Sequence, residues 1–371
     1  MAGSYTKIGN KYRVTLELGT DENGKRLRKY VTVTKESEAK KIINEFEYNK
    51  QRNLLVKFSE MKIREFIEHW MDNYVKFNCE ETTIYGYRNI INNHILPFLG
   101  EIKLQELHTM HIQQYYKQLM ELKKLSSVTV HKHHAILRKA LDYALKHQLV
   151  YRNVADAVSL PKKERFKGKT YTKEQLNKLL EMVVDTKLEL PVFLGGYLGL
   201  RRGEITGLKW KNVDLENRLV HVHEVRTSAG EKVIIKKPKS EKSRRSIYIV
   251  DELYEVLIKH KNLQSEYKKL FGKEYQNTGY VVVREDGKPY RVNTVTEQFK
   301  KFLEDNNLPQ IRLHDLRHTF SSILYSEGVD LKAISEVLGH SDISTTNSIY
   351  THLFDVTHKK TVSVMSKALR K

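Results

Sequence analysis

The sequence predicts a multidomain protein with a small ββα unit, an all-α helical domain and a larger domain of mixed α+β structure. Three observations predict this fold class. The chain has 371 residues, which suggests two or three domains at about 100–200 residues each. Its hydrophobic periodicity alternates near the N-terminus, is helical in the middle and is mixed in the remainder. A short, strongly basic segment, typical of a linker, precedes the mixed part.

The charge balance predicts a polyanionic partner. Lysine and arginine number 65 against 45 aspartate and glutamate residues, so the formal net charge is +20, while 40% of the residues are hydrophobic. This composition excludes a disordered basic tail and favours a folded protein whose surface binds a polyanion. The single cysteine, Cys79, excludes an intramolecular disulfide and a cysteine-based zinc site.

Neither secretion nor membrane spanning is predicted. The N-terminus lacks the apolar run of a signal peptide, and no stretch of about 18 apolar residues occurs in the chain. Together with the low cysteine content, this predicts a cytoplasmic protein in a reducing compartment.

Residues 1–56 are predicted to form the ββα unit. Apolar and polar residues alternate from Tyr12 to Leu18 and again from Leu27 to Val33, and the Asn-Gly pair between them is a typical hairpin turn. Apolar residues recur at helical spacing over residues 35–50, which predicts a helix.

The exposed face of this hairpin would carry Arg13, Arg28 and Tyr30 together with several threonines. Such side chains suit phosphates and base edges if a sheet enters a DNA groove. An ordinary solvated sheet face would have a similar composition, so both interpretations remain open.

Residues 57–160 show a helical pattern throughout, which predicts an independent bundle of four or five helices. Pro97 and Gly100 end one helix, and Thr109 and Ser126 are predicted to be the N-caps of two others. Four polar residues on this domain are candidate DNA contacts, although solvation of a helical surface explains them equally well: Arg88, Lys132, His134 and Arg138.

The basic linker PKKERFKGK covers residues 161–169 and includes Lys167 as a further candidate DNA contact. The last domain, residues 170–371, mixes helices and strands. Helices are predicted near residues 173–184 and 190–199, strands near 219–225, 233–236, 246–250 and 280–283, and helices from there to the C-terminus.

Three separated motifs in the last domain could carry chemistry. They are YLGLRRGEITGLKW around Arg201, LHDLRHTF with His314 and Arg317, and LGHSDISTTNSIYTH with His340 and Tyr350. Each motif alone is weak. An HxxR pair on one helix face is usually a surface ridge, LGH is a common helix end, and Tyr350 is one of 21 tyrosines.

Together, in this order and at these separations, the motifs resemble the tyrosine recombinase (phage integrase) family. The resemblance covers residues 170–355 strongly and 58–160 more loosely. It implies an arm-type DNA-binding domain at residues 1–56, a SAM-like core-binding domain at 57–160 and a catalytic domain with a C-terminal tail at 170–371. The N-terminal unit is most similar to those of integrases from conjugative transposons.

The resemblance also implies roles for individual residues. Arg201 and Arg317 match the catalytic arginines, His314 and His340 the catalytic histidines, and Tyr350 the nucleophile.

Two further positions follow from the same resemblance. Glu204 matches the acidic residue that supports Arg201, and Lys239 matches the lysine of a β-hairpin. Arg202 is a rival for the first arginine but falls one position outside the motif. Three lysines close to Lys239 leave that assignment open: Lys236, Lys237 and Lys242.

The residue types suit phosphodiester chemistry. Arg201 and Arg317 can bind both non-bridging oxygens of a phosphate without losing their protons. A tyrosine nucleophile stores the bond energy in a phosphotyrosyl link, so rejoining needs no ATP, and no Walker-type motif is present. Lys239 or a neighbouring imidazole could protonate the leaving 5′-hydroxyl. Because no two-metal acidic cluster is apparent, we expect neither a metal nor a cofactor.

The predicted function is site-specific recombination that integrates and excises a mobile element through 3′-phosphotyrosyl intermediates and a four-way junction. The expected partners are double-stranded DNA with core crossover and arm-type sites, three further protomers in a homotetramer, and an accessory directionality factor. The protein would associate with the nucleoid when bound to DNA. A type IB topoisomerase and a catalytically silent DNA-binding regulator are the alternatives.

The tail, residues 357–371, carries an apolar stripe of Val362, Met365 and Leu369 at helical spacing. A short helix of this kind is stable only if it packs on something. It could fold back onto its own domain or, as the resemblance implies, dock on a neighbouring protomer, and the second arrangement is preferred.

Overall fold

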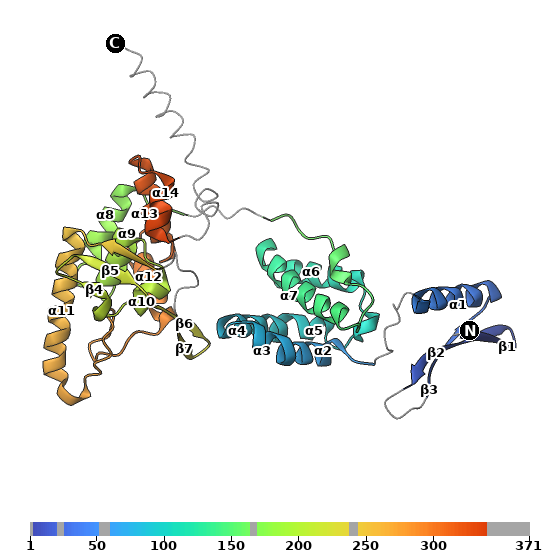
Figure 1. The fold of residues 1–371 in the computed structure, drawn as a ribbon. Helices are drawn as coiled ribbons and strands as arrows, with labels where there is room; N and C mark the ends of the chain where they lie inside the picture. Colours follow the sequence, from blue (N-terminus) through green and yellow to red (C-terminus); the bar gives the residue numbers. More distant parts are fainter. Residues whose placement is uncertain (1–2, 21–25, 52–59, 164–168, 237–243, 340–371) are drawn as a thin grey trace, which may run out of the picture. The chain divides into compact units, whose positions relative to one another are not determined.

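The computed structural model describes residues 3–20, 26–51, 60–163, 169–236 and 244–339 (Figure 1). The chain divides into two compact units, Met1–Arg165 and Phe166–Lys371. Six predictions lie outside the described residues, namely those for the Asn23-Gly24 turn, Lys167, Lys239, His340, Tyr350 and the tail 357–371. Among the described residues, no helix is long and apolar enough to cross a membrane.

The first unit begins with a three-stranded antiparallel sheet in the order β1-β2-β3. Its strands are β1 (Gly3–Ile8), β2 (Lys11–Thr20) and β3 (Arg26–Val33), followed by the helix α1 (Glu36–Gln51). Val14 and Leu16 of β2 pack with Ala39 and Phe46 of α1 in a small core. Because side chains alternate along a strand, Arg13 and its neighbours in register lie on the other face of the sheet.

The hairpin and the helix confirm the predicted ββα arrangement, but the unit has an additional first strand, so the prediction is wrong in that respect. Residues 3–8, GSYTKI, pair with β2 from Gly3 opposite Leu16 to Ile8 opposite Lys11. Gly3 is buried and Tyr5 is partly buried, whereas the other four residues of β1 are exposed. The segment therefore lacks the apolar alternation that marks a half-buried strand.

Residues 60–163 form a helical domain with its own hydrophobic core. Two of its helical segments each contain an internal π-helical turn, at η1 (Met71–Val75) and η2 (Ile91–Ile95). The complete order is α2 (Ile63–Trp70), η1, α3 (Lys76–Asn78), α4 (Glu81–Ile90), η2, α5 (Leu96–Leu99), η3 (Leu104–Glu106), α6 (Thr109–Glu121), α7 (Ser127–Lys146) and η4 (Val154–Ala157).

One of the two predicted N-caps in this domain is confirmed. The hydroxyl of Ser126 accepts a hydrogen bond from the backbone N–H of Thr129 at the start of α7. The prediction for Thr109 is wrong by one position, because His108 is the N-cap of α6. Thr109 is instead the first helical residue, and its hydroxyl donates to the carbonyl of Val154.

The second unit is a mixed α/β domain that is built around α9 (Glu189–Leu198). This helix is buried on nearly all sides, and it packs against α8 (Lys173–Met182), α10 (Arg202–Gly207), α11 (Asp251–Phe271) and α13 (Asp315–Ser326). The other helices are η5 (Trp210–Asn212), η7 (Gly272–Glu274), α12 (Val292–Asp305) and α14 (Leu331–Leu338). Figure 1 shows the long α11 along one side of this unit.

Two small sheets complete the second unit. One has the antiparallel order β4-β5-β8, and the other is the hairpin β6-β7. The strands are β4 (Val213–Asp214), β5 (Leu219–Val222), β6 (Val225–Ala229), β7 (Lys232–Lys236) and β8 (Arg245–Tyr248). The hairpin contacts α10 and α12.

Two strand predictions in this unit need correction. The predicted strand 219–225 is divided, because β5 ends at Val222 and the chain then leaves that sheet to form β6 in the hairpin. The predicted strand 280–283 makes only isolated bridges, Lys209 with Tyr280 and Val283 with Pro289. Its apolar run is explained by burial in the core rather than by pairing in a sheet.

Candidate active site

The candidate site is centred on Arg201, the residue that precedes α10. Its backbone N–H donates to Glu204 Oε2 at 2.9 Å, and its Nη1 donates to Glu204 Oε1 at 2.8 Å. Glu204 is in the first turn of α10 and therefore fixes both the backbone and the side chain of Arg201. The side chain of Arg201 remains 34% exposed, whereas that of Glu204 is 2% exposed.

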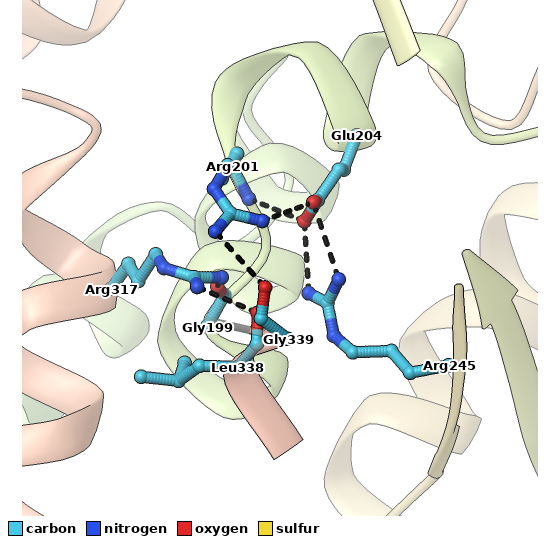
Figure 2. A network of polar contacts seen from close by, with 7 residues as sticks. All are labelled: Gly199, Arg201, Glu204, Arg245, Arg317, Leu338 and Gly339. Atoms are coloured by element: carbon cyan, nitrogen blue, oxygen red, sulfur yellow. Dashed lines mark hydrogen bonds and ion pairs between the residues drawn. The ribbon is translucent and has the colours of Figure 1, made fainter. Parts of the chain in front are cut away.

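A second arginine, Arg245 at the start of β8, binds the same carboxylate (Figure 2). Its Nη1 is 3.2 Å from Glu204 Oε1 and its Nη2 is 2.9 Å from Oε2, which is a bidentate ion pair. Both side chains are buried, at 6% and 2% exposure. Removing one partner of a buried pair costs about 3–5 kcal/mol because the other charge is left uncompensated.

The environment of Glu204 keeps it ionised. Burial by itself would raise the pKa of Glu204, but the hydrogen bonds and charge of Arg245, followed by those of Arg201, lower it to about 2. Since this folded-state pKa lies below the ordinary value, the ion pairs stabilise the fold above the ordinary pKa, and that contribution disappears as the pH falls towards 2. At neutral pH the carboxylate is fully charged.

Arg317, in the first turn of α13, is 2% exposed. Its Nη1 donates to the carbonyl of Gly199 at 2.8 Å, and its Nη2 donates to the carbonyl of Leu338 at 2.6 Å. These carbonyls lie at the C-terminal ends of α9 and α14, where the helix dipole favours a cation.

The two guanidinium groups converge on neighbouring residues of the same turn. Arg201 Nη2 lies 3.5 Å from the carbonyl oxygen of Gly339, next to the Leu338 carbonyl that Arg317 binds. Figure 2 shows Arg201 above this turn and Arg317 to its left, with both side chains directed at it. The arrangement concentrates positive charge at one point, which suits an anionic group such as a phosphate.

Glycine is required at position 199, where α9 ends. The residue has φ of +59°, and an added Cβ would lie 2.8 Å from Leu338 Cδ2 and 2.9 Å from Phe320 Cδ1. Only glycine meets both constraints without strain. The tight turn that follows places Arg201 at the start of α10 and the Gly199 carbonyl within reach of Arg317.

A second glycine brings the β6-β7 hairpin onto α10. An added Cβ on Gly207 would lie 2.8 Å from the backbone nitrogen of Arg226 in β6. The close approach holds the hairpin against the helix that carries Glu204. Strand β7 ends at Lys236, and the predicted hairpin lysine, Lys239, follows shortly after it in the sequence, outside the described residues.

His314 is the residue before α13; part of the residue is exposed to solvent, while neighbouring protein atoms surround its ring. Its ring is 5.1 Å from that of His318 in an edge-to-face arrangement. Desolvation by surrounding protein atoms, followed by the positive charges of His318, Arg317 and Arg201, lowers the pKa of His314 to about 4. The imidazole is therefore neutral at pH 7 and can accept a proton.

The structure brings Arg201, Glu204, His314 and Arg317 together at one site, as the motifs predict. Their predicted catalytic roles remain proposals. The rival Arg202 donates to Asn293 of α12 at 3.0 Å instead, which favours Arg201 as the site arginine.

Sequence reasoning missed Arg245. The signal available was an arginine immediately before the predicted strand 246–250, but Glu204 lies 41 positions earlier in the chain. No local spacing links residues that far apart, so the pair could not be predicted.

The predicted DNA contacts in the first unit differ in their exposure and in their partners within the protein. Arg13, Arg28 and Tyr30 are all exposed on the sheet face away from α1, with Arg28 3.5 Å from Glu17. In the helical domain, two of the four candidates have protein partners: Arg138 pairs with Asp156 at 2.6 Å, and His134 Nδ1 lies 3.0 Å from the Tyr116 hydroxyl, whereas Arg88 and Lys132 are exposed.

Two family profiles match this chain. The profile described as "Phage integrase family" matches residues 169–356, and the profile described as "Phage integrase, N-terminal SAM-like domain" matches residues 62–120. Among curated proteins, the "Tyrosine recombinase XerC-like" protein of Caldanaerobacter subterraneus is 31% identical over 94% of both chains. The "ICEBs1 integrase" of Bacillus subtilis is 27% identical over 95% of this chain and 96% of the relative.

Solved structures show a similar fold. The Tn1549 transposon integrase in complex with transposon right end DNA has a TM-score of 0.69 and 21% identity, and the match covers 82% of this chain and 100% of that one. A lambda integrase tetramer bound to a Holliday junction has a TM-score of 0.59 and 16% identity over 90% of this chain and 92% of that one.

Proposed function

Because this chain belongs to the phage integrase family and is a tyrosine-type site-specific recombinase, we propose that it integrates and excises a mobile genetic element. The convergence of Arg201 and Arg317 on the turn at Leu338 and Gly339 is the observation that carries the proposal. It supplies positive charge where a DNA phosphodiester would be attacked. The similarity to integrases of mobile elements supports the biological role.

The arginines stabilise the charge that develops on the phosphate. Attack on phosphorus increases negative charge on the two non-bridging oxygens, and guanidinium groups bind such oxygens while remaining protonated. Arg201 is partly exposed and can contact the phosphate as it stands. Arg317 donates to two helix-end carbonyls in this structure, so direct binding of phosphate would exchange one of these contacts.

Tyr350 acts as the nucleophile in this proposal. Its hydroxyl oxygen forms a bond to phosphorus while the bond to the 5′-oxygen breaks, which leaves a 3′-phosphotyrosyl link. The neutral imidazole of His314 accepts the tyrosine proton, Lys239 donates a proton to the leaving 5′-oxygen, and His340 donates a hydrogen bond to the phosphate. Attack by a 5′-hydroxyl of the partner strand reverses these steps, so no ATP is consumed.

The working complex is proposed to contain four protomers and two DNA duplexes that exchange strands through a four-way junction. A lambda integrase tetramer on such a junction has a similar fold. The tail, residues 357–371, docks on a neighbouring protomer, and a directionality factor selects integration or excision. Exposed Arg88 and Lys132, with Lys167 of the linker, contact the core DNA.

A covalent-capture experiment tests the function. Duplexes that bind the full chain are selected from a random-sequence library, nicked near the centre of the bound site and incubated with the protein in EDTA. We expect a protein–DNA adduct that survives denaturant, and recombinant products when two sites are supplied. Absence of an adduct would identify a silent regulator, and relaxation of supercoiled DNA without recombinants would identify a type IB topoisomerase.

The N-terminal sheet is proposed to bind a second, arm-type DNA sequence. Arg13 and Tyr30 are exposed on its free face, and each lies opposite a threonine on the neighbouring strand, Thr32 and Thr15 respectively. Arginine, tyrosine and threonine side chains on a sheet can bind phosphates and base edges when the sheet enters a groove.

Deleting residues 1–56 is therefore expected to abolish protection of the arm-type sequence in a footprinting experiment while the core site stays protected. The full-length Arg13→Ala variant should weaken arm binding alone, because the sheet and its core remain intact. Identical footprints for the truncated and the full chain would show that the sheet does not bind DNA.

A further inference from the structure

We infer that Arg245 is a positioning residue for DNA cleavage, because it holds Glu204 in the orientation in which Glu204 holds Arg201. The inference rests on the proposed function, in which Arg201 binds the phosphate under attack. Arg245 itself is expected to touch neither the phosphate nor the nucleophile. It acts through the carboxylate that it shares with Arg201.

The hydrogen bonds around the carboxylate are arranged symmetrically. Glu204 Oε1 accepts from Arg201 Nη1 at 2.8 Å and from Arg245 Nη1 at 3.2 Å. Glu204 Oε2 accepts from the Arg201 backbone N–H at 2.9 Å and from Arg245 Nη2 at 2.9 Å. Each oxygen therefore bridges the two arginines, and rotating the carboxylate would weaken its bonds to both of them.

Arg245 is the fixed end of this bridge. Its side chain is 6% exposed, against 34% for Arg201. Its backbone lies in β8, which is paired with β5 along its whole length, from Arg245 opposite Val222 to Tyr248 opposite Leu219. A guanidinium group anchored in a sheet can hold a partner in place, whereas the more exposed Arg201 depends on such support for its own orientation.

The charges lead to the same conclusion. A carboxylate paired with Arg201 alone would cancel the positive charge that the phosphate requires. With Arg245 on its other side, one negative charge is shared between two positive charges, so the group as a whole keeps one positive charge. The network thus orients Arg201 without neutralising it.

Arg245→Met tests the inference, since methionine keeps most of the side-chain length and removes the charge. The measurement is the single-turnover rate of adduct formation at saturating DNA between pH 5.5 and 8.5, on a nicked duplex selected by binding to the full chain. We expect a rate about 100-fold below wild type near pH 5.5, the scale of a misplaced reacting group, with unchanged DNA affinity.

The pH profile distinguishes positioning from loss of fold. Without Arg245, burial raises the pKa of Glu204, so the carboxylate becomes protonated at low pH and ionises again as the pH rises. The ratio of wild-type to variant rate should therefore fall with increasing pH. In Arg245→Met combined with Glu204→Gln the ratio should not vary with pH, because the amide does not titrate. Arg245→Lys, which keeps the charge without the fork, should lie between wild type and Arg245→Met.

Lys259→Met is the matched control. It removes the Lys259 ammonium, 2.8 Å away, from Glu189, which is the other buried glutamate among the described residues of this unit. His260 Nε2 stays 3.0 Å from the same carboxylate. Glu189 begins α9, a 10-residue helix, so it lies about 15 Å from the end of α9 that leads to Arg201. This variant should lose stability while its adduct rate and pH profile stay at wild-type values.

Two results would overturn the inference. One is an Arg245→Met rate within twofold of wild type at every pH. The other concerns the reactivity of Arg201 towards phenylglyoxal, which is measured by mass spectrometry in the absence of DNA. If Arg245 holds the Arg201 guanidinium in place, Arg201 should react several-fold more slowly in wild type than in Arg245→Met. Equal reactivity would show that Arg245 does not position Arg201. Because this readout needs no DNA, it still decides the inference if the wild-type protein forms no adduct and the proposed function fails.

Discussion

Replacing Tyr350 with phenylalanine is expected to abolish the covalent protein–DNA adduct, because the substitution removes only the oxygen that attacks phosphorus. No other atom of the side chain takes part in the proposed reaction, so the affinity for the core site should stay within about twofold of wild type. A denaturing gel of the reaction with a nicked duplex measures the adduct, and a binding titration with the same duplex measures the affinity.

The matched control is Tyr248→Phe. Tyr248 is a tyrosine of the same unit that is 76% exposed, and the proposed mechanism does not use it. This variant should form the adduct at the wild-type rate. If Tyr350→Phe still forms an adduct, peptide mapping of the linked residue would identify another nucleophile, and the assignment of Tyr350 would be wrong.

Arg201→Lys is expected to lower the single-turnover cleavage rate by about 10²–10³-fold, the range found when one preorganised donor to a developing oxyanion is removed. Arg201 uses Nη1 to bind Glu204 while the rest of its guanidinium faces the turn at Gly339. A lysine ammonium is a point charge, so it cannot hold the carboxylate and present a planar fork to the phosphate at the same time. The rate is measured at saturating DNA, where weakened binding does not contribute.

The neighbouring arginine provides the control for this prediction. Arg202→Lys is the same substitution one position further along the chain and also keeps the positive charge, but Arg202 donates to Asn293 and not to Glu204. Its cleavage rate should remain close to wild type. A large loss of cleavage rate in Arg202→Lys together with a normal rate in Arg201→Lys would show that Arg202, and not Arg201, is the catalytic arginine.

Much of the site could be predicted from the sequence because its parts are local. Arg201 and Glu204 are three residues apart across one helical turn, and so are His314 and Arg317. A pair at this spacing is brought together by the helix itself, whatever the rest of the chain does. The hairpin and the helix of the N-terminal unit were likewise predictable from periodicities of two and 3.6 residues.

Weak local signals account for the errors. The edge strand β1 is mostly exposed, so its residues carry no apolar alternation. Residues 280–283 form an apolar run because they lie in the core, although they pair with the rest of the chain only through isolated bridges. Both cases depend on what surrounds the segment rather than on the segment itself.

The sequence by itself determined the family, the fold class and the local pairs that carry the chemistry, because motifs and short-range spacings can be recognised directly in the amino-acid sequence. Only the tertiary structure decided how those pairs meet. Arg317 binds the carbonyl of Gly199 across 118 positions, Arg201 approaches that of Gly339 across 138, and Arg245 reaches Glu204 across 41. These contacts arise where α9, α13, α14 and β8 pack around one point. Contacts between elements that are distant in the sequence leave no periodic pattern or fixed spacing along the chain, so they could not be predicted from it.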